Sequence, residues 1–173
     1  MNRQQRKRLV KDLVSSRQLP QLIAFAQEDK RVVGVLCALL FEQDDRIRWR
    51  AIEALGAVAA VLSVTNIESV RELLRRLEWL MNDESGGSGW HSPEAMAAIV
   101  MNVPVMMDDF GLILGSYLND EPLRRGAHWA VAAIAKTRPD LFTDSIEYLS
   151  CYLLSFDLYF LLYFFFVVFW LEV

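Results

Sequence analysis

The side chains that could perform acid–base, metal or nucleophilic chemistry are few and widely spaced in this sequence. The two histidines, His91 and His128, each stand beside a tryptophan, and the two cysteines, Cys37 and Cys151, lie far apart. A zinc site needs three or four ligands at short, regular spacings, and covalent catalysis needs a base beside its nucleophile. Neither arrangement can be argued from these positions. We therefore predict no catalytic residue, no metal, no cofactor, and reduced thiols typical of a cytoplasmic protein.

A second group of residues has the types that dominate protein-binding surfaces. Tryptophan and arginine contribute most often to such surfaces, and an aromatic ring open to water favours a covering partner. With about 100° of rotation per helical residue, Trp49 and Glu53 fall opposite an apolar side formed by Ala51 and its neighbours. Equivalent positions later in the chain carry Trp90, Glu94, Arg125 and Trp129. We predict one face lined by these six residues that binds a protein or peptide. The alternative is that each tryptophan packs in a groove between helices.

These positions are equivalent because one stretch of the chain recurs. Residues 44–56 read DDRIRWRAIEALG, and residues 120–132 read DEPLRRGAHWAVA. A partial copy around Trp90 and Glu94 lacks the Asp and the Arg. Copies that recur along a chain in this way are typical of proteins built from stacked pairs of helices. The aligned positions in the two full copies are Asp44 with Asp120, Arg48 with Arg124, Ala51 with Ala127, Ala54 with Ala130, and Leu55 with Val131.

An Asp, an Arg four residues later, two alanines three apart and then an aliphatic residue form a pattern that resembles the HEAT-repeat family. The similarity is to its short PBS-lyase HEAT-like form, covers roughly residues 19–155, and extends to a bacterial group without an assigned activity. It implies an all-α, armadillo-type fold: a right-handed α-solenoid of about four helix pairs. It also implies a non-catalytic scaffold, with the second helix of each pair lining a concave face. By resemblance, four residues bridge neighbouring units: Asp44, Arg48, Asp120 and Arg124.

An enzyme is the rival interpretation, because some HEAT-like proteins resemble bilin lyases and others resemble DNA glycosylases. Nucleic-acid binding requires a basic face. The net charge of −4, together with Glu53 and Glu94, disfavours such a partner.

Helical periods and capping residues predict where the helices lie. Asp44, Asn66, Ser92 and Asp120 are expected at helix starts, where a side-chain oxygen can accept a hydrogen bond from a free backbone N–H. The expected helices cover 3–14, 19–27, 31–42, 44–62, 66–81, a segment from 92, 107–118, 120–136 and 141–154.

The end of the chain departs from the repeat, so we divide it into a HEAT-like domain, 1–156, and an atypical apolar segment, 157–173. Bulky Phe164 and Val167 stand where a fourth unit would need alanine, within the run LYFLLYFFFVVFWL. Three interpretations fit: a C-terminal membrane anchor, an apolar cap buried on the solenoid, or a change of reading frame. A membrane span needs about 20 apolar residues, so an anchor would take 149–171 and make the protein a membrane-attached adaptor. Exposed parts of the segment would otherwise promote self-association.

Overall fold

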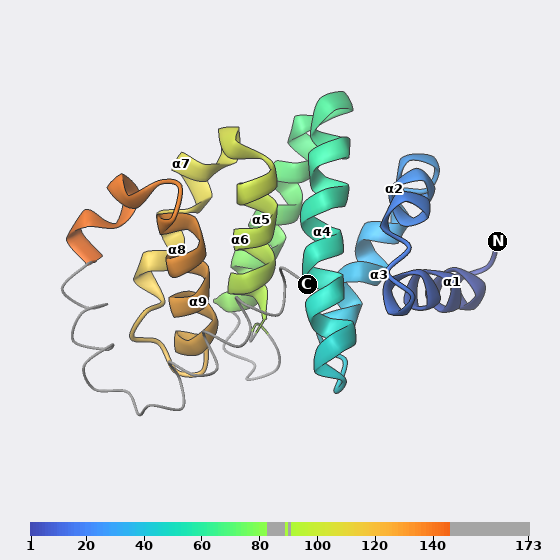
Figure 1. Cartoon of the computed structure of the whole chain (residues 1–173), viewed down its shortest axis with the longest axis horizontal. Helices are drawn as coiled ribbons and strands as arrows, with labels where there is room; N and C mark the ends of the chain where they lie inside the picture. The colour runs from blue at the N-terminus through green and yellow to red at the C-terminus, as the bar shows by residue number, and fades with distance from the viewer. Residues whose placement is uncertain (83–88, 90, 146–173) are drawn as a thin grey trace.

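The computed structural model describes residues 1–82, 89 and 91–145, and their regular structure is entirely helical, as the sequence predicts. Helices α4, α6 and α9 stand side by side, one after another along the long axis of the molecule and with their own axes across it, and α6 lies between the other two (Figure 1). We call these three helices the central row. Their bounds are Asp45–Thr65 for α4, Ser92–Asn102 for α6 and Arg124–Ala135 for α9.

Small residues let the helices of the central row approach closely. Ala51, Ala127 and Ala130 are fully buried, and Ala54 is nearly so. At Gly56 of α4 an added Cβ would lie 2.6 Å from the carbonyl oxygen of Ala98 in α6. Such a distance leaves room for hydrogen only, so the contact between α4 and α6 depends on glycine at this position.

Each helix of the central row packs against a helix that precedes it in the chain. Helix α3 packs on α4, α5 on α6, and α8 on α9, while α1 and α2 cover the remaining side of α4. The bounds of these helices are Arg3–Ser15 for α1, Leu19–Glu28 for α2, Arg31–Leu39 for α3, Ile67–Met81 for α5 and Ile113–Ser116 for α8.

Helix α5 shows how the sequence pattern produces this packing. The side chain of Asn66 caps its start by accepting a hydrogen bond from the N–H of Ser69 at 3.2 Å, as predicted. One apolar stripe is buried, whereas Glu68, Glu72 and Arg75 face solvent. The buried stripe consists of Val70, Leu73, Leu74, Leu77 and Met81.

The prediction of one continuous helix over 107–118 is wrong. The structure has a 3-10 turn, Pro104–Met106, then α7, Met107–Phe110, and after a break α8. At Gly111 a Cβ would lie 2.5 Å from the carbonyl oxygen of Met107. Glycines at 111 and 115 also lower the helical propensity of this segment, which accounts for two short helices in place of one.

Two predicted helix starts are also shifted. Ser92 is the first helical residue of α6, and His91 occupies the N-cap position without a side-chain cap bond. Helix α9 begins at Arg124, after a turn in which the carbonyl of Asp120 accepts the Arg124 N–H at 2.6 Å. Asp120 therefore does not cap α9, because Pro122 follows it and the turn separates its side chain from the first helical N–H groups.

The Asp and Arg of the repeat make local contacts. Asp44 caps α4 by accepting a hydrogen bond from the N–H of Arg46 at 2.9 Å. Arg48 pairs with Asp45, and its Nη1 donates to the carbonyl of Glu42 at 2.5 Å. Arg124 likewise pairs with Glu121, three residues before it. The turn before its own helix and the first residue of that helix thus supply the acceptors of Arg48. A bridge to a neighbouring unit, which the resemblance implies, stays a prediction.

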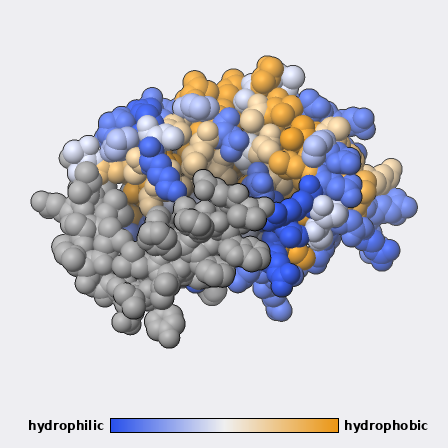
Figure 2. All heavy atoms as spheres, viewed as in Figure 1, coloured by the Kyte–Doolittle hydropathy of each residue, from blue (hydrophilic) through white to orange (hydrophobic). Residues whose placement is uncertain are grey.

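Several apolar groups on the outside lie at one edge of the face that Figure 2 draws. Figure 2 shows them along the upper edge, where α4 and α6 end; Val64 is 85% and Val105 is 71% exposed. Over the described residues, no helix combines the length and the apolar character needed to cross a membrane. The segment 149–171 and Cys151 lie outside that part of the chain, so the structure does not bear on the three interpretations of the tail.

Candidate functional site

Two tryptophans that are far apart in the sequence meet across the central row. The ring centroids of Trp49, in α4, and Trp129, in α9, are 4.9 Å apart, and the ring planes are tilted by 57°. Since α6 lies between α4 and α9, the two indoles reach across it. Both rings are half-buried and rest on the core, so each keeps a part exposed to solvent. Tilted aromatic pairs of this kind add about 0.5–1.5 kcal/mol beyond the area that they bury.

Exposed charges stand one helical turn from each tryptophan. Glu53 follows Trp49 by four residues on α4, and Arg125 precedes Trp129 by four residues on α9; both are exposed. Residues four apart on a helix share one face. The described residues thus include four of the six predicted ones: the aromatic pair and the charged residue one turn from each tryptophan. Trp90 lies outside the described residues.

Glu94 is buried, contrary to the prediction that it faces away from the core. The residue is 4% exposed, and its Oε1 lies 3.1 Å from His91 Nδ1. Its Oε2 is enclosed without a hydrogen-bond partner. A Cβ at Gly126 of α9 would stand 2.5 Å from that oxygen. Because glycine lets the backbone of α9 approach this closely, the carboxylate is covered. The positive end of the α6 dipole also favours a negative charge in this first turn.

Two buried groups with reactive potential, the His128 imidazole and the Cys37 thiol, are favoured in their uncharged forms. Burial lowers the pKa of His128, and the nearby charge of Arg124 lowers it further, against a hydrogen bond with the backbone of Leu118 that raises it. Burial likewise raises the pKa of the Cys37 thiol. A neutral thiol shielded from solvent is a poor nucleophile. In the described ranges, no three His, Cys, Asp or Glu side chains are grouped as a metal site requires.

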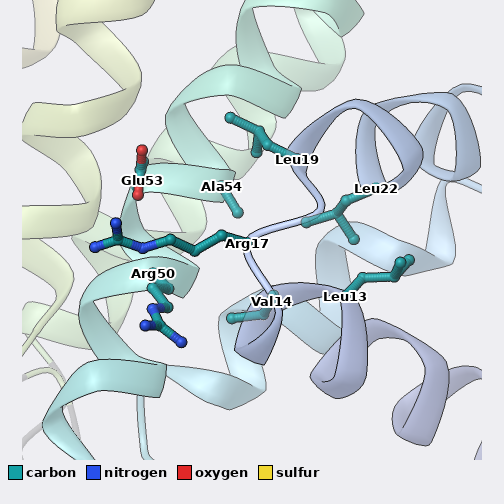
Figure 3. Close-up of a pocket in the computed structure, with 8 residues that line it drawn as sticks. All are labelled: Leu13, Val14, Arg17, Leu19, Leu22, Arg50, Glu53 and Ala54. Atoms are coloured by element: carbon teal, nitrogen blue, oxygen red, sulfur yellow. The ribbon is translucent and has the colours of Figure 1, made fainter.

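A cavity of about 240 Å³ lies between the α1–α2 turn and α4, and it includes Glu53 of the predicted binding face (Figure 3). Its charged lining residues are Arg17, Arg50 and Glu53. Of these, only Glu53 belongs to the predicted binding face. The cavity itself could not be predicted, because it is formed by a turn whose geometry does not follow from a residue pattern. The apolar lining consists of Leu13, Val14, Leu19, Leu22 and Ala54.

Comparisons of this chain with protein-family models, with curated proteins and with solved structures found no match. The resemblance to HEAT repeats therefore depends on the repeated residues of the chain itself.

Proposed function

We propose that this protein is a short HEAT-like solenoid that acts as a non-catalytic binding module. The solvent-facing surface of the central row, which is the concave side by resemblance to HEAT repeats, would hold a peptide segment of a partner protein. The observation that carries the proposal is the contact between Trp49 and Trp129. An aromatic pair drawn from two helices and left partly exposed provides a large, rigid apolar contact.

The order of the helices supports the solenoid part of the proposal. Each helix of the central row has its own partner helix behind it, and α6 contacts both α4 and α9. A stack of helix pairs gives one long surface formed by equivalent helices, and repeat proteins use such surfaces for binding.

The charges around the aromatic pair suggest how a partner is oriented. Glu53 and Arg125 are exposed on the two outer helices of the row, each four residues from the tryptophan of its own helix. A partner that places a basic group near Glu53 and an acidic group near Arg125 would complement both, which favours one binding direction over the other. Glu94 is covered, so we assign it a structural role in holding α6 against α9.

The test compares three variants, each of which replaces one tryptophan with alanine. Trp49→Ala and Trp129→Ala remove the pair, whereas Trp79→Ala removes a side chain that is 65% exposed on α5, outside the central row. We expect the first two variants to bind partner proteins at least roughly tenfold more weakly, as loss of a central aromatic anchor does. Trp79→Ala should bind like the wild type. Affinity capture followed by quantitative mass spectrometry measures this, with circular dichroism as the check on folding. Equal capture by all three variants would exclude the central row as the binding surface.

A further inference from the structure

The cavity beside the central row combines an apolar floor with two guanidinium groups. Figure 3 shows the side chain of Arg17, from the α1–α2 turn, between two lining residues of α4: Glu53 is above it in this view, and Arg50 is below it and turns away from Glu53. Within the described residues, no ion pair links Glu53 to either arginine. The charged groups of the cavity thus sum to one positive charge, in a chain whose net charge is −4.

Arg50 is fixed in place by the end of α1. Its Nη1 donates to the carbonyl of Ser15 at 2.5 Å, and Ser15 is the last residue of that helix. One N–H of the guanidinium is therefore anchored, while the other four have no acceptor in the part of the chain that the structure describes and can bind a ligand.

Arg17 has a backbone conformation that a non-glycine residue rarely adopts. Its φ is 55°, in the left-handed region. The turn closes with hydrogen bonds from the N–H of Arg17 to the Val14 carbonyl at 3.2 Å and from the N–H of Gln18 to the Leu13 carbonyl at 2.9 Å. This is the helix ending in which glycine usually occupies the left-handed position. Strained residues of this kind are concentrated at functional sites, and here the strain places a guanidinium at the edge of the cavity.

The size and chemistry of the cavity define its ligand. About 240 Å³ is below the 300–1,000 Å³ typical of small-molecule pockets, so it suits a single residue. The floor requires an aliphatic side chain, and the arginines require an anion. At the end of a polypeptide the last side chain and the carboxylate are attached to one Cα, so both can enter a space this small. An internal acidic residue would need a second, aliphatic residue and room for the chain to leave again.

We propose that this cavity binds the C-terminal residue of the partner protein, an aliphatic residue whose α-carboxylate contacts Arg17 and Arg50. Glu53 would accept a hydrogen bond from the backbone N–H of that residue. This contact would direct the rest of the peptide along α4 toward Trp49. The inference rests on the proposed function, because it identifies which part of a bound partner reaches this end of the surface.

The experiment uses the full chain and a defined probe, an N-acetylated peptide of glycine and serine that ends in leucine with a free carboxylate. Binding is followed by NMR shifts of the backbone amides of Arg17 and Ala54. We expect saturable shifts, and roughly tenfold or greater weakening when the same peptide ends in an amide. Arg50→Gln and Arg17→Gly should weaken the free-acid peptide similarly. Arg46→Gln, one turn before Arg50 and outside the cavity lining, is the matched control and should bind normally.

Two results would overturn the proposal: equal binding of the acid and the amide, or equal binding of a peptide with an internal Leu-Asp and an amidated end. Failure of the proposed function looks different. If the leucine peptide does not bind while capture of partners still depends on Trp49 and Trp129, only the cavity assignment is wrong. If the peptide binds and the tryptophan variants capture partners normally, the central row is not the binding surface.

Discussion

Gly126 of α9 lies so close to Glu94 of α6 that a Cβ at position 126 would stand 2.5 Å from Glu94 Oε2. The carboxylate is buried and held by His91, so it cannot move aside without losing that contact. This pair therefore fixes the distance between two helices of the central row.

The first prediction concerns this pair. Gly126→Ala should destabilise the fold by about 1–3 kcal/mol, the usual effect of adding a methyl group to a packed interface. Glu94→Ala should remove the obstruction, so the double variant should be more stable than the sum of the two single effects predicts. Urea unfolding of the four proteins measures the coupling. Additive effects would mean that Glu94 does not occupy the space beside Gly126.

The second prediction contrasts two helical glycines. A Cβ at Gly56 would lie 2.6 Å from the backbone oxygen of Ala98, whereas a Cβ at Gly34 in α3 has nothing within 4 Å. Gly56→Ala should destabilise the protein by about 1–3 kcal/mol through overpacking of backbone against backbone. Gly34→Ala should stabilise it by about 0.5–1 kcal/mol, because alanine is the better helix former. Thermal unfolding distinguishes the two; unchanged or increased stability of Gly56→Ala would argue against the close contact of α4 with α6.

The third prediction concerns the strained turn at Arg17. Arg17→Gly should raise the free energy of unfolding by about 1 kcal/mol, because glycine adopts the left-handed conformation without a clash. Arg17→Ala is the control, since it removes the guanidinium but keeps the strain, and it should leave stability nearly unchanged. If glycine and alanine had the same effect, φ at this position would not be positive.

The fourth prediction concerns the loss of folding stability at acidic pH. Burial lowers the pKa of His128 in the folded state, while an unfolded histidine has a pKa of about 6.5. The unfolded chain therefore binds this proton more readily. The stability that neutral His128 provides is complete above pH 6.5 and is lost as pH falls through 6.5 toward the folded pKa. Urea unfolding between pH 7.5 and 5 should show this loss, and His128→Gln should abolish it.

Asp29 becomes protonated at a lower pH than the range in which His128 acts, so it does not contribute to the loss of stability measured there. Hydrogen bonds from Arg31, and then from Arg6, hold the pKa of Asp29 well below its usual range. The stability that it provides is present above about pH 4, the unfolded value, and is lost only below it. A decline between pH 6.5 and 5 that survives in His128→Gln would contradict the assignment to His128.

The helices were largely predictable because their patterns are local. The Asn66 cap, the Asp44 cap and the buried alanines follow from residue type and spacing alone. The pairing of Trp49 with Trp129 required the repeat, which aligns the two helices, but their contact across α6 could not be derived from it.

Two features of the site could not be predicted, for physical reasons. The burial of Glu94 depends on how closely α9 approaches at Gly126, and that distance is set by the packing of whole helices. The left-handed conformation at Arg17 is one that glycine usually adopts, so an arginine at this position does not predict it.

The central claim is that the first and third copies of the repeat bring their tryptophans together over the helix between them. A double-mutant cycle in urea with Trp49→Ala, Trp129→Ala and the double variant tests it most directly. We predict a coupling energy of about 0.5–1.5 kcal/mol, the range for aromatic pairs in contact. Single effects that add within about 0.3 kcal/mol would show that the two rings do not touch, and would contradict the binding surface built on them.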